Sequence, residues 1–297
     1  MNRITTAEDL LNATGKGQKK IAVAVAEDLE VLSGLKEAIA KQMVSPVLFG
    51  NELKIREVAK LADLSLDNIE VRDAVSSDEA IRNALLSVKN GQAQMLMKGG
   101  VNTALFLKSV LDKQYGLRKS SLLSHVALFF PPSLSRPIVV TDAALNLQPS
   151  LEDKVALINN AVAVLKRLGI ETPKVAVLAH NEVVSPKVQA SVDAAKLKEM
   201  AVSGEIKGCI VDGPIALDCA LSIEACRHKG LESPVCGCAD ILLCPDIVSA
   251  NILYKSMVFL AHANCAAIIE GASVPLVVAS RAEDARTKLL SVALAAI

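Results

Sequence analysis

The stretch GASVPLVVASRAEDA, residues 271–285, decides how the rest of the chain is interpreted. Its apolar run predicts a short buried strand over residues 274–279 that turns directly into a final helix. Ser280 is followed three residues later by Glu283, which is a capping-box pattern, so we expect Ser280 to be the N-cap. Such a junction offers unpaired backbone N–H groups and the positive end of a helix dipole, and both favour an anion. Arg281 adds a planar fork of donors at the same point; a capped helix with a solvated arginine is the alternative interpretation.

Short apolar runs alternate with amphipathic helical patterns along the rest of the chain. Strands are expected at residues 20–26, 46–49, 68–71, 93–97, 174–179, 208–211, 240–243 and 266–269. Helices are expected at residues 28–41, 51–61, 78–89, 102–113, 150–168, 186–200, 216–228, 247–263 and 282–296, with Ser185 capping the helix that Pro186 begins. This alternation predicts parallel, doubly wound sheets with right-handed crossovers.

One segment interrupts the alternation. Strands predicted at residues 125–130 and 138–141 are separated only by PPSLSRP, which is too short for a helical crossover and therefore indicates an antiparallel hairpin. We take this hairpin as a domain boundary. The sequence thus predicts two doubly wound α/β domains with a cleft between them, residues 1–124 plus 276–297 forming the first and residues 125–275 the second.

The composition supports this fold class. Of the 297 residues, 52% are hydrophobic but only 2% are aromatic and none is Trp, so the cores consist of closely packed aliphatic side chains, as in helices laid on a parallel sheet. No apolar run approaches the ~18 residues of a membrane-spanning helix, and the N-terminal segment lacks a signal-peptide core. We expect a soluble cytoplasmic protein. Thirty-two basic residues balance 32 acidic ones, so no net charge attracts nucleic acid or a membrane surface.

Common catalytic and metal-binding patterns are missing from the sequence. It contains no dinucleotide-binding or P-loop glycine pattern and no G-x-S-x-G elbow. The seven cysteines are expected to be reduced core residues, and the spacing of Cys236 and Cys238 is not that of a zinc finger or ribbon, so we expect no metal. His125 and His262 lie within apolar runs and are expected to be structural.

Polar residues instead follow several predicted strands. Ligands of open α/β sheets bind beyond the carboxyl ends of the strands. The residues expected at those ends are Lys98, Asp142, Asp212, Asp246 and the pair Ser280 and Arg281.

Three of the surrounding motifs resemble a known family. VDGPIALD (211–218), CPDIVSANILYK (244–255) and GASVPLVVASR (271–281) are similar, in order and spacing, to motifs of the phosphate acetyltransferase/phosphate butyryltransferase family. Lys98-Gly99 with Thr103, GLR (116–118), SLLSHVA (121–127), VTDAALN (140–146) and VVSPKVQASVDA (183–194) resemble its butyryl branch more than its acetyl branch. The resemblance covers essentially the whole chain. It implies a fold similar to isocitrate and isopropylmalate dehydrogenases, an active site between two domains, and a homodimer whose contacts we expect in residues 125–275.

The resemblance also implies an activity: reversible transfer of a short acyl group between coenzyme A and inorganic phosphate, without an acyl-enzyme. It implies no cofactor other than the coenzyme A thioester that serves as substrate, and metabolic coupling to an acyl kinase. Arg281 is then expected to bind the phosphoryl group or the oxyanion, and Ser280 the reacting sulfur or phosphate. Thr287 stands where the acetyl branch has a carboxylate, so Asp284 or Glu283 is the candidate base. The expected substrate-binding residues are Lys98, Thr103, Lys108, Asp142, Asp212, Asp246, Asn251 and Lys255.

Several alternatives stay open at this point. The acetyl branch is the nearest one; an NAD(P)- and metal-dependent hydroxy-acid dehydrogenase on the related fold and a non-catalytic acyl-CoA-binding regulator belong to other classes. Asp246 could simply cap its helix. Asn251 and Lys255 could form a solvated helix face, and Asp142 could be a turn residue.

Overall fold

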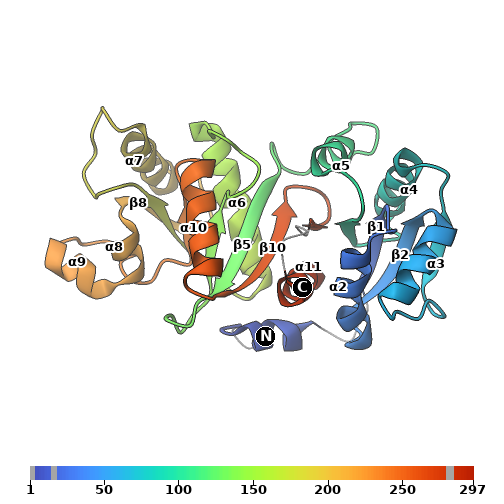
Figure 1. Cartoon of the computed structure of the whole chain (residues 1–297). Coiled ribbons are helices and arrows are strands. Elements are labelled where there is room, and N and C mark those ends of the chain that lie inside the picture. Colours follow the sequence, from blue (N-terminus) through green and yellow to red (C-terminus); the bar gives the residue numbers. More distant parts are fainter. Residues whose placement is uncertain (1–3, 15–18, 279–283) are drawn as a thin grey trace. The chain divides into compact units, whose positions relative to one another are not determined.

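The structure, a computed structural model, describes residues 4–14, 19–278 and 284–297. Helices and strands alternate along the chain (Figure 1), which confirms the predicted α/β class. The chain divides into two units: unit 1 comprises Ser121–Asn264 with the N-terminal residues up to Thr6, and unit 2 comprises Ala7–Ser120 and Cys265–Ile297. The boundaries expected from the sequence lie instead at 124/125 and 275/276.

Unit 2 contains a mostly parallel sheet in the order β3-β2-β1-β4-β11-β10, of which only β10 and β11 pair antiparallel. Its strands are β1 (Lys19–Ala24), β2 (Val44–Gly50), β3 (Glu70–Asp73), β4 (Met95–Lys98), β10 (Asn264–Glu270) and β11 (Leu276–Val277). Its helices are α1 (Ala7–Ala13), α2 (Leu29–Ala40), α3 (Glu52–Leu61), α4 (Ser77–Lys89), α5 (Thr103–Val110) and α11 (Ala285–Ala296).

The parallel strands of unit 2 lead into helices with well-formed N-caps. The side chains of Asp28, Asn51, Ser76 and Asn102 accept backbone N–H groups at the starts of α2, α3, α4 and α5. These caps satisfy donors that a helix start otherwise leaves unpaired. Helix α11 packs against α2 although the two are far apart in the sequence (Figure 1). Because α2 to α5 each follow one of the parallel strands β1 to β4, the N-termini of these helices lie at the carboxyl edge of the sheet.

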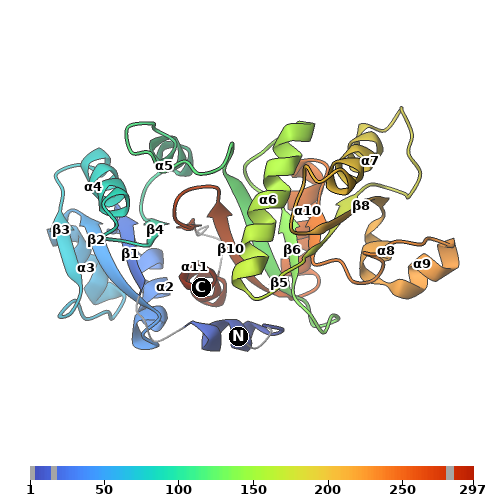
Figure 2. The same ribbon diagram turned by 180° about the vertical axis from the view of Figure 1, so that it is seen from behind.

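Unit 1 contains strands that pair in the order β5-β6-β9-β7-β8. Its strands are β5 (Ser124–Phe130), β6 (Ile138–Thr141), β7 (Lys174–Leu178), β8 (Ile210–Ile215) and β9 (Ile241–Leu243). Its helices are α6 (Leu151–Arg167), α7 (Gln189–Val202), α8 (Leu217–Leu221), α9 (Ile223–Lys229) and α10 (Ile247–Phe259). Strands β5 and β6 pair antiparallel, which confirms the predicted hairpin, and the remaining pairs are parallel. Helix α10 covers one face of this sheet (Figure 1) and α6 the opposite face (Figure 2).

Two helices of unit 1 differ from their predicted extent. The helix predicted at residues 186–200 begins only at Gln189, because Ser191 Oγ donates to Ser185 O and accepts from Ser185 N, which holds Ser185 in the preceding turn. The helix predicted at residues 216–228 is broken at Ser222, whose backbone is extended and whose side chain accepts from Ala225 N. Ser185 and Pro186 therefore lie in the turn before α7, and Ser222 separates α8 from α9.

The cysteines also differ from expectation in one respect. Cys226 and Cys236 form a disulfide, so the prediction that all seven are reduced is wrong for this pair. The remaining five, Cys209, Cys219, Cys238, Cys244 and Cys265, are free. Within the described ranges, no helix is both long and apolar enough to cross a membrane.

Candidate functional site

Asp142 lies at the carboxyl end of β6 and is only 3% exposed. Its carboxylate accepts four hydrogen bonds: Oδ1 from the backbone N–H groups of Ala144 and Leu145, and Oδ2 from His125 N and Asn146 Nδ2. Because the donors come from the start of β5 and from the loop after β6, Asp142 fixes both segments against each other. The turn role considered for Asp142 is thus present, and its substrate-binding role stays a prediction.

Helix α10 brings three further predicted residues to this carboxyl edge. Asp246 follows β9 and is the N-cap, accepting from Ser249 N at 2.8 Å. Asn251 Nδ2 donates to Ala143 O at 3.0 Å, next to Asp142, so the amide ties α10 to the loop that Asp142 orders. Asn251 also stays exposed. Asp246, Asn251 and Asp142 are therefore brought together, as predicted for the end of the unit 1 sheet.

Lys255 lies one turn further along α10 and is exposed. Its Nζ lies 5.2 Å from the centre of the Tyr254 ring and 6.0 Å from that of Phe259, which is cation–π geometry. The aromatic faces thereby hold an ammonium group at the edge that already carries Asn251. A phosphate or an oxyanion suits such a position.

His125, for which the sequence predicted a structural role, is the second residue of β5. Its backbone N–H donates to Asp142 Oδ2 at 3.1 Å, and its carbonyl accepts from Thr141 Oγ1 at 3.0 Å. The imidazole packs edge-on against Tyr254, with 5.6 Å between ring centres. Burial, together with the positive charge of Lys255, lowers the pKa of His125 below its usual 6.5, and the Asp142 carboxylate opposes this shift. The polar setting comes from residues distant in sequence, so the apolar run alone could not reveal it.

Asp212 lies apart from this group. It lies within β8, and not after the strand as predicted, because β8 continues through Gly213 to Ile215. Its carboxylate accepts from Lys198 Nζ at 2.7 Å, from Ser233 Oγ at 2.6 Å and from Gly213 N. These contacts fasten β8 to α7 and to the segment before β9. A substrate-binding role for Asp212 stays a prediction.

The carboxyl edge of unit 2 carries the other predicted binding residues. Lys98 ends β4, and its Nζ donates to the carbonyls of Gly99 and Val101, both at 3.0 Å. Thr103 is the first residue of α5, and Lys108 lies in the last turn of that helix; both are exposed. Lys98 thus shapes the strand-to-helix loop, while Thr103 begins a capped helix whose N–H groups favour an anion.

Glu27 lies at the carboxyl edge of unit 2, and the sequence analysis did not single it out. Its Oε1 accepts from Asn51 N at 3.4 Å, and its Oε2 is buried without a hydrogen-bond partner within the described ranges. A Cβ at Gly50 would lie 1.9 Å from that oxygen, so glycine at this position lets the Glu27 carboxylate keep its place. No sequence signal links Glu27 to Gly50, because only the pairing of β1 with β2 brings them together.

The predicted catalytic pair, Ser280 and Arg281, lies outside the described residues. The final helix, α11, begins at Ala285 and not at residue 282, and its N-cap is Asp284, whose Oδ1 accepts from Thr287 N at 2.7 Å. Strand β11 is also shorter than the predicted 274–279. Asp284 therefore has a structural role that competes with its predicted role as a base, because its Oδ1 already accepts a hydrogen bond.

Replacing Asp284 with alanine is expected to lower the free energy of unfolding by ~0.5–2 kcal/mol, because the start of α11 loses its side-chain acceptor. Asp284→Asn retains an acceptor and is expected to unfold close to the parent. Urea unfolding followed by circular dichroism measures both. Equal stability of Asp284→Ala and the parent would show that this cap is not formed in solution.

One cluster in unit 1 has metal-ligand chemistry. Glu182, Asp218 and Cys219 place one possible ligand atom each within 4.8 Å of one another. However, Lys229 Nζ lies 3.0 Å from an oxygen of each carboxylate, so the ammonium already occupies the position between them. These ion pairs lower the pKa of Asp218 and raise that of Lys229. The predicted absence of a metal site stays a prediction.

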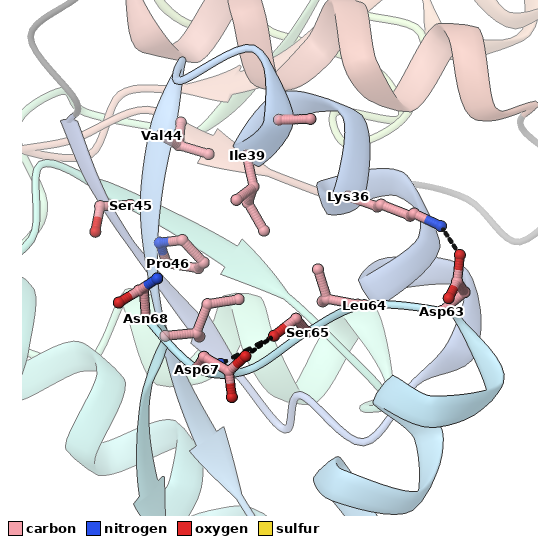
Figure 3. A pocket seen from close by; sticks show the side chains of 12 residues that line it. Lys36, Ile39, Val44, Ser45, Pro46, Asp63, Leu64, Ser65, Asp67 and Asn68 are labelled. Atoms are coloured by element: carbon pink, nitrogen blue, oxygen red, sulfur yellow. Dashed lines mark hydrogen bonds and ion pairs between the residues drawn. The ribbon is translucent and has the colours of Figure 1, made fainter.

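Figure 3 shows a pocket of about 390 Å³ in unit 2. It is lined by the end of α2, by Val44 and Pro46 at the start of β2, and by the segment that carries Asp67; an ion pair between Lys36 and Asp63 lies at its side. The pocket therefore lies at the amino end of β2, on the edge opposite to Lys98. It contains none of the predicted site residues.

Known proteins resemble the chain along nearly its whole length. A family described as "Phosphate acetyl/butaryl transferase" matches residues 71–296. A phosphate butyryltransferase of Clostridium beijerinckii is 45% identical over 279 residues, which are 94% of this chain and 92% of that protein. A phosphate acetyltransferase of Thermotoga maritima is 44% identical over 285 residues, 96% of each chain.

A solved structure agrees with these sequences. The crystal structure of a branched-chain phosphotransacylase from Enterococcus faecalis V583 has a TM-score of 0.83 and 30% identity, and the match covers 94% of this chain and 98% of that one. The family predicted from the three sequence motifs is thereby confirmed. The chain belongs to the phosphate acetyl/butyryl transferase family.

Proposed function

We propose that the chain is a phosphate butyryltransferase, which transfers a short straight or branched acyl group reversibly between coenzyme A and inorganic phosphate. The observation that carries this proposal is the 45% identity to a phosphate butyryltransferase over 94% of the chain. The likeness to a branched-chain phosphotransacylase supports it. The sequence motifs from residue 98 to residue 194 also favour the butyryl branch.

The chemistry needs two substrates to be positioned and charge on the acyl oxygen to be stabilised, with no cofactor. The polar groups at the carboxyl edges of both sheets suit this task. In unit 1 these are the amide of Asn251 and the ammonium of Lys255; in unit 2 they are Lys98, Thr103 and Lys108. Ser280 and Arg281 complete the proposed set, as their motif predicts.

We expect four- and five-carbon coenzyme A esters to have a higher kcat/KM than acetyl-CoA. Each extra methyl or methylene group is worth ~1–3 kcal/mol in an apolar pocket, about tenfold or more, and these chains have two or three carbons more than acetyl, so the preference is expected to be at least ~10²-fold. Phosphate-dependent thiol release from butanoyl-CoA, 2-methylpropanoyl-CoA and acetyl-CoA measures it. A higher kcat/KM for acetyl-CoA would make the chain a phosphate acetyltransferase, the second candidate, which the 44% identity to the Thermotoga maritima enzyme favours.

The proposal includes partners and a location. We infer a homodimer, which the exposed apolar side chains Val248, Ile252 and Phe259 along α10 support, because apolar stripes of this kind are commonly covered by another chain. Sedimentation at the mass of one chain would contradict it.

The acyl phosphate product is a phosphoryl donor, which suits an acyl kinase as the next enzyme. Five free cysteines favour the cytoplasm, whereas a disulfide such as that of Cys226 and Cys236 is uncommon there.

A further inference from the structure

Nδ1 of His125 is buried and has no hydrogen-bond partner in the part of the chain that the structure describes. The residue as a whole keeps partial exposure, and Nε2 is not among the buried atoms without a partner, so Nε2 is the ring nitrogen left for a substrate. A structural histidine ordinarily joins two groups through its ring nitrogens, whereas this ring contributes only an edge-on contact with Tyr254. Leaving a buried polar atom unpaired is destabilising, and such a cost calls for a functional explanation.

The neighbours of the ring supply that explanation. Tyr254 of α10 contacts the ring edge-on, and the charges of Asp142 at the end of β6 and of Lys255 on α10 both act on it. The Asp142 carboxylate is already occupied by four donors and is not available as a base. Its negative charge nevertheless favours an imidazolium once one forms, through charge alone and without a hydrogen bond to Nδ1.

We propose that His125 transfers the proton of the coenzyme A thiol, an inference that rests on the proposed acyl transfer. Nε2 takes the thiol proton, and the sulfur electron pair forms a C–S bond with the acyl carbon. The bond between the acyl carbon and the phosphate oxygen then breaks. The electron pair of that bond leaves with phosphate, which receives the proton from the imidazolium. In the opposite direction, the imidazole takes a proton from phosphate as a phosphate oxygen attacks the thioester carbon, the C–S bond breaks, and the imidazolium protonates the leaving thiolate.

The electrostatic setting agrees with this role. A base must be neutral before it accepts a proton, and burial and Lys255 both lower the pKa of His125. The imidazole therefore stays neutral down to a pH below its usual 6.5. Consequently kcat for acyl phosphate plus coenzyme A is expected to be nearly constant from pH 6.5 to 8 in the parent.

The test replaces His125 with glutamine and measures kcat against pH for butanoyl phosphate plus coenzyme A at saturation. We expect a loss of ~10²–10⁴ at pH 7. The remaining activity is expected to rise about tenfold per pH unit, because only thiolate that forms in solution then reacts. The exposed His228 in α9 supplies the matched control: His228→Gln is expected to keep both kcat and the flat profile.

The outcomes separate the two proposals. If the parent shows no phosphate-dependent thiol release, the proposed function fails. If the parent is active and His125→Gln keeps kcat within threefold with a flat profile, only the role of His125 fails. Thermal melting shows whether the variant folds, and His125→Asn provides a smaller replacement. The parent profile decides independently of both variants: a parent kcat that itself rises tenfold per unit from pH 6.5 to 8 overturns the proposal.

Discussion

Replacing Arg281 with alanine is expected to lower kcat by ~10²–10³, the usual loss when a preorganised donor for a developing charge is removed. The expectation rests on the motif that ends at Arg281 and on membership of the acyltransferase family. Arg281→Lys is expected to recover only part of the activity, since an ammonium cannot reproduce the two-pronged contact of a guanidinium.

Arg286 provides the matched control, because it lies five residues further on, in α11. It forms an ion pair with Glu8, and both side chains are exposed, so the pair is worth little. Arg286→Ala is expected to keep kcat within a few-fold of the parent. If Arg281→Ala also stays within a few-fold, the anion site assigned to this stretch is in the wrong place.

Replacing Asp193 with alanine is expected to cost about 3–5 kcal/mol of unfolding free energy. Asp193 on α7 pairs with Lys154 on α6 at 2.6 Å, and the side chains are only 9% and 6% exposed. Removing the carboxylate leaves a buried ammonium without its counter-charge and also removes the acceptor of Gln189 Nε2. Lys154→Met combined with Asp193→Leu removes both charges and is expected to restore much of the loss.

A second ion pair has the same distance between its charged atoms but exposed side chains, so it shows the effect of burial alone. Lys36 and Asp63 are also 2.6 Å apart, but their side chains are 45% and 94% exposed. Asp63→Ala is therefore expected to leave the unfolding free energy close to that of the parent. Urea unfolding followed by circular dichroism compares the two. Equal losses at the two sites would contradict the view that burial determines the cost.

Much of the fold follows from local patterns. Apolar periodicity predicted the alternation of strands and helices, and the short connection between β5 and β6 predicted their antiparallel pairing. Helix boundaries were less predictable, because capping signals overlap. Ser280 and Glu283 fit a capping box, yet Asp284 with Thr287 N forms the cap. A serine and an aspartate four residues apart both satisfy the local rule, and only the packing of α11 decides between them.

The positions of Asp142 and Asp246 were predictable, because each comes within three residues of the end of a strand. Asn251 ties α10 to the loop after β6, and Asp246 begins the same helix. The polar surroundings of His125 were not predictable, because its neighbours in sequence are apolar and its polar contacts come from β6 and α10. The disulfide between Cys226 and Cys236 was missed for the same reason. A contact between α9 and a later loop depends on the tertiary structure.

The most direct test of the proposed function follows butanoyl-CoA with the parent enzyme, with and without inorganic phosphate. Free thiol is measured with a thiol reagent, and acyl phosphate is trapped in parallel with hydroxylamine. The account predicts that thiol appears only when phosphate is present and that one acyl phosphate forms for each thiol released. Thiol release without phosphate, or release with phosphate but without acyl phosphate, would contradict it.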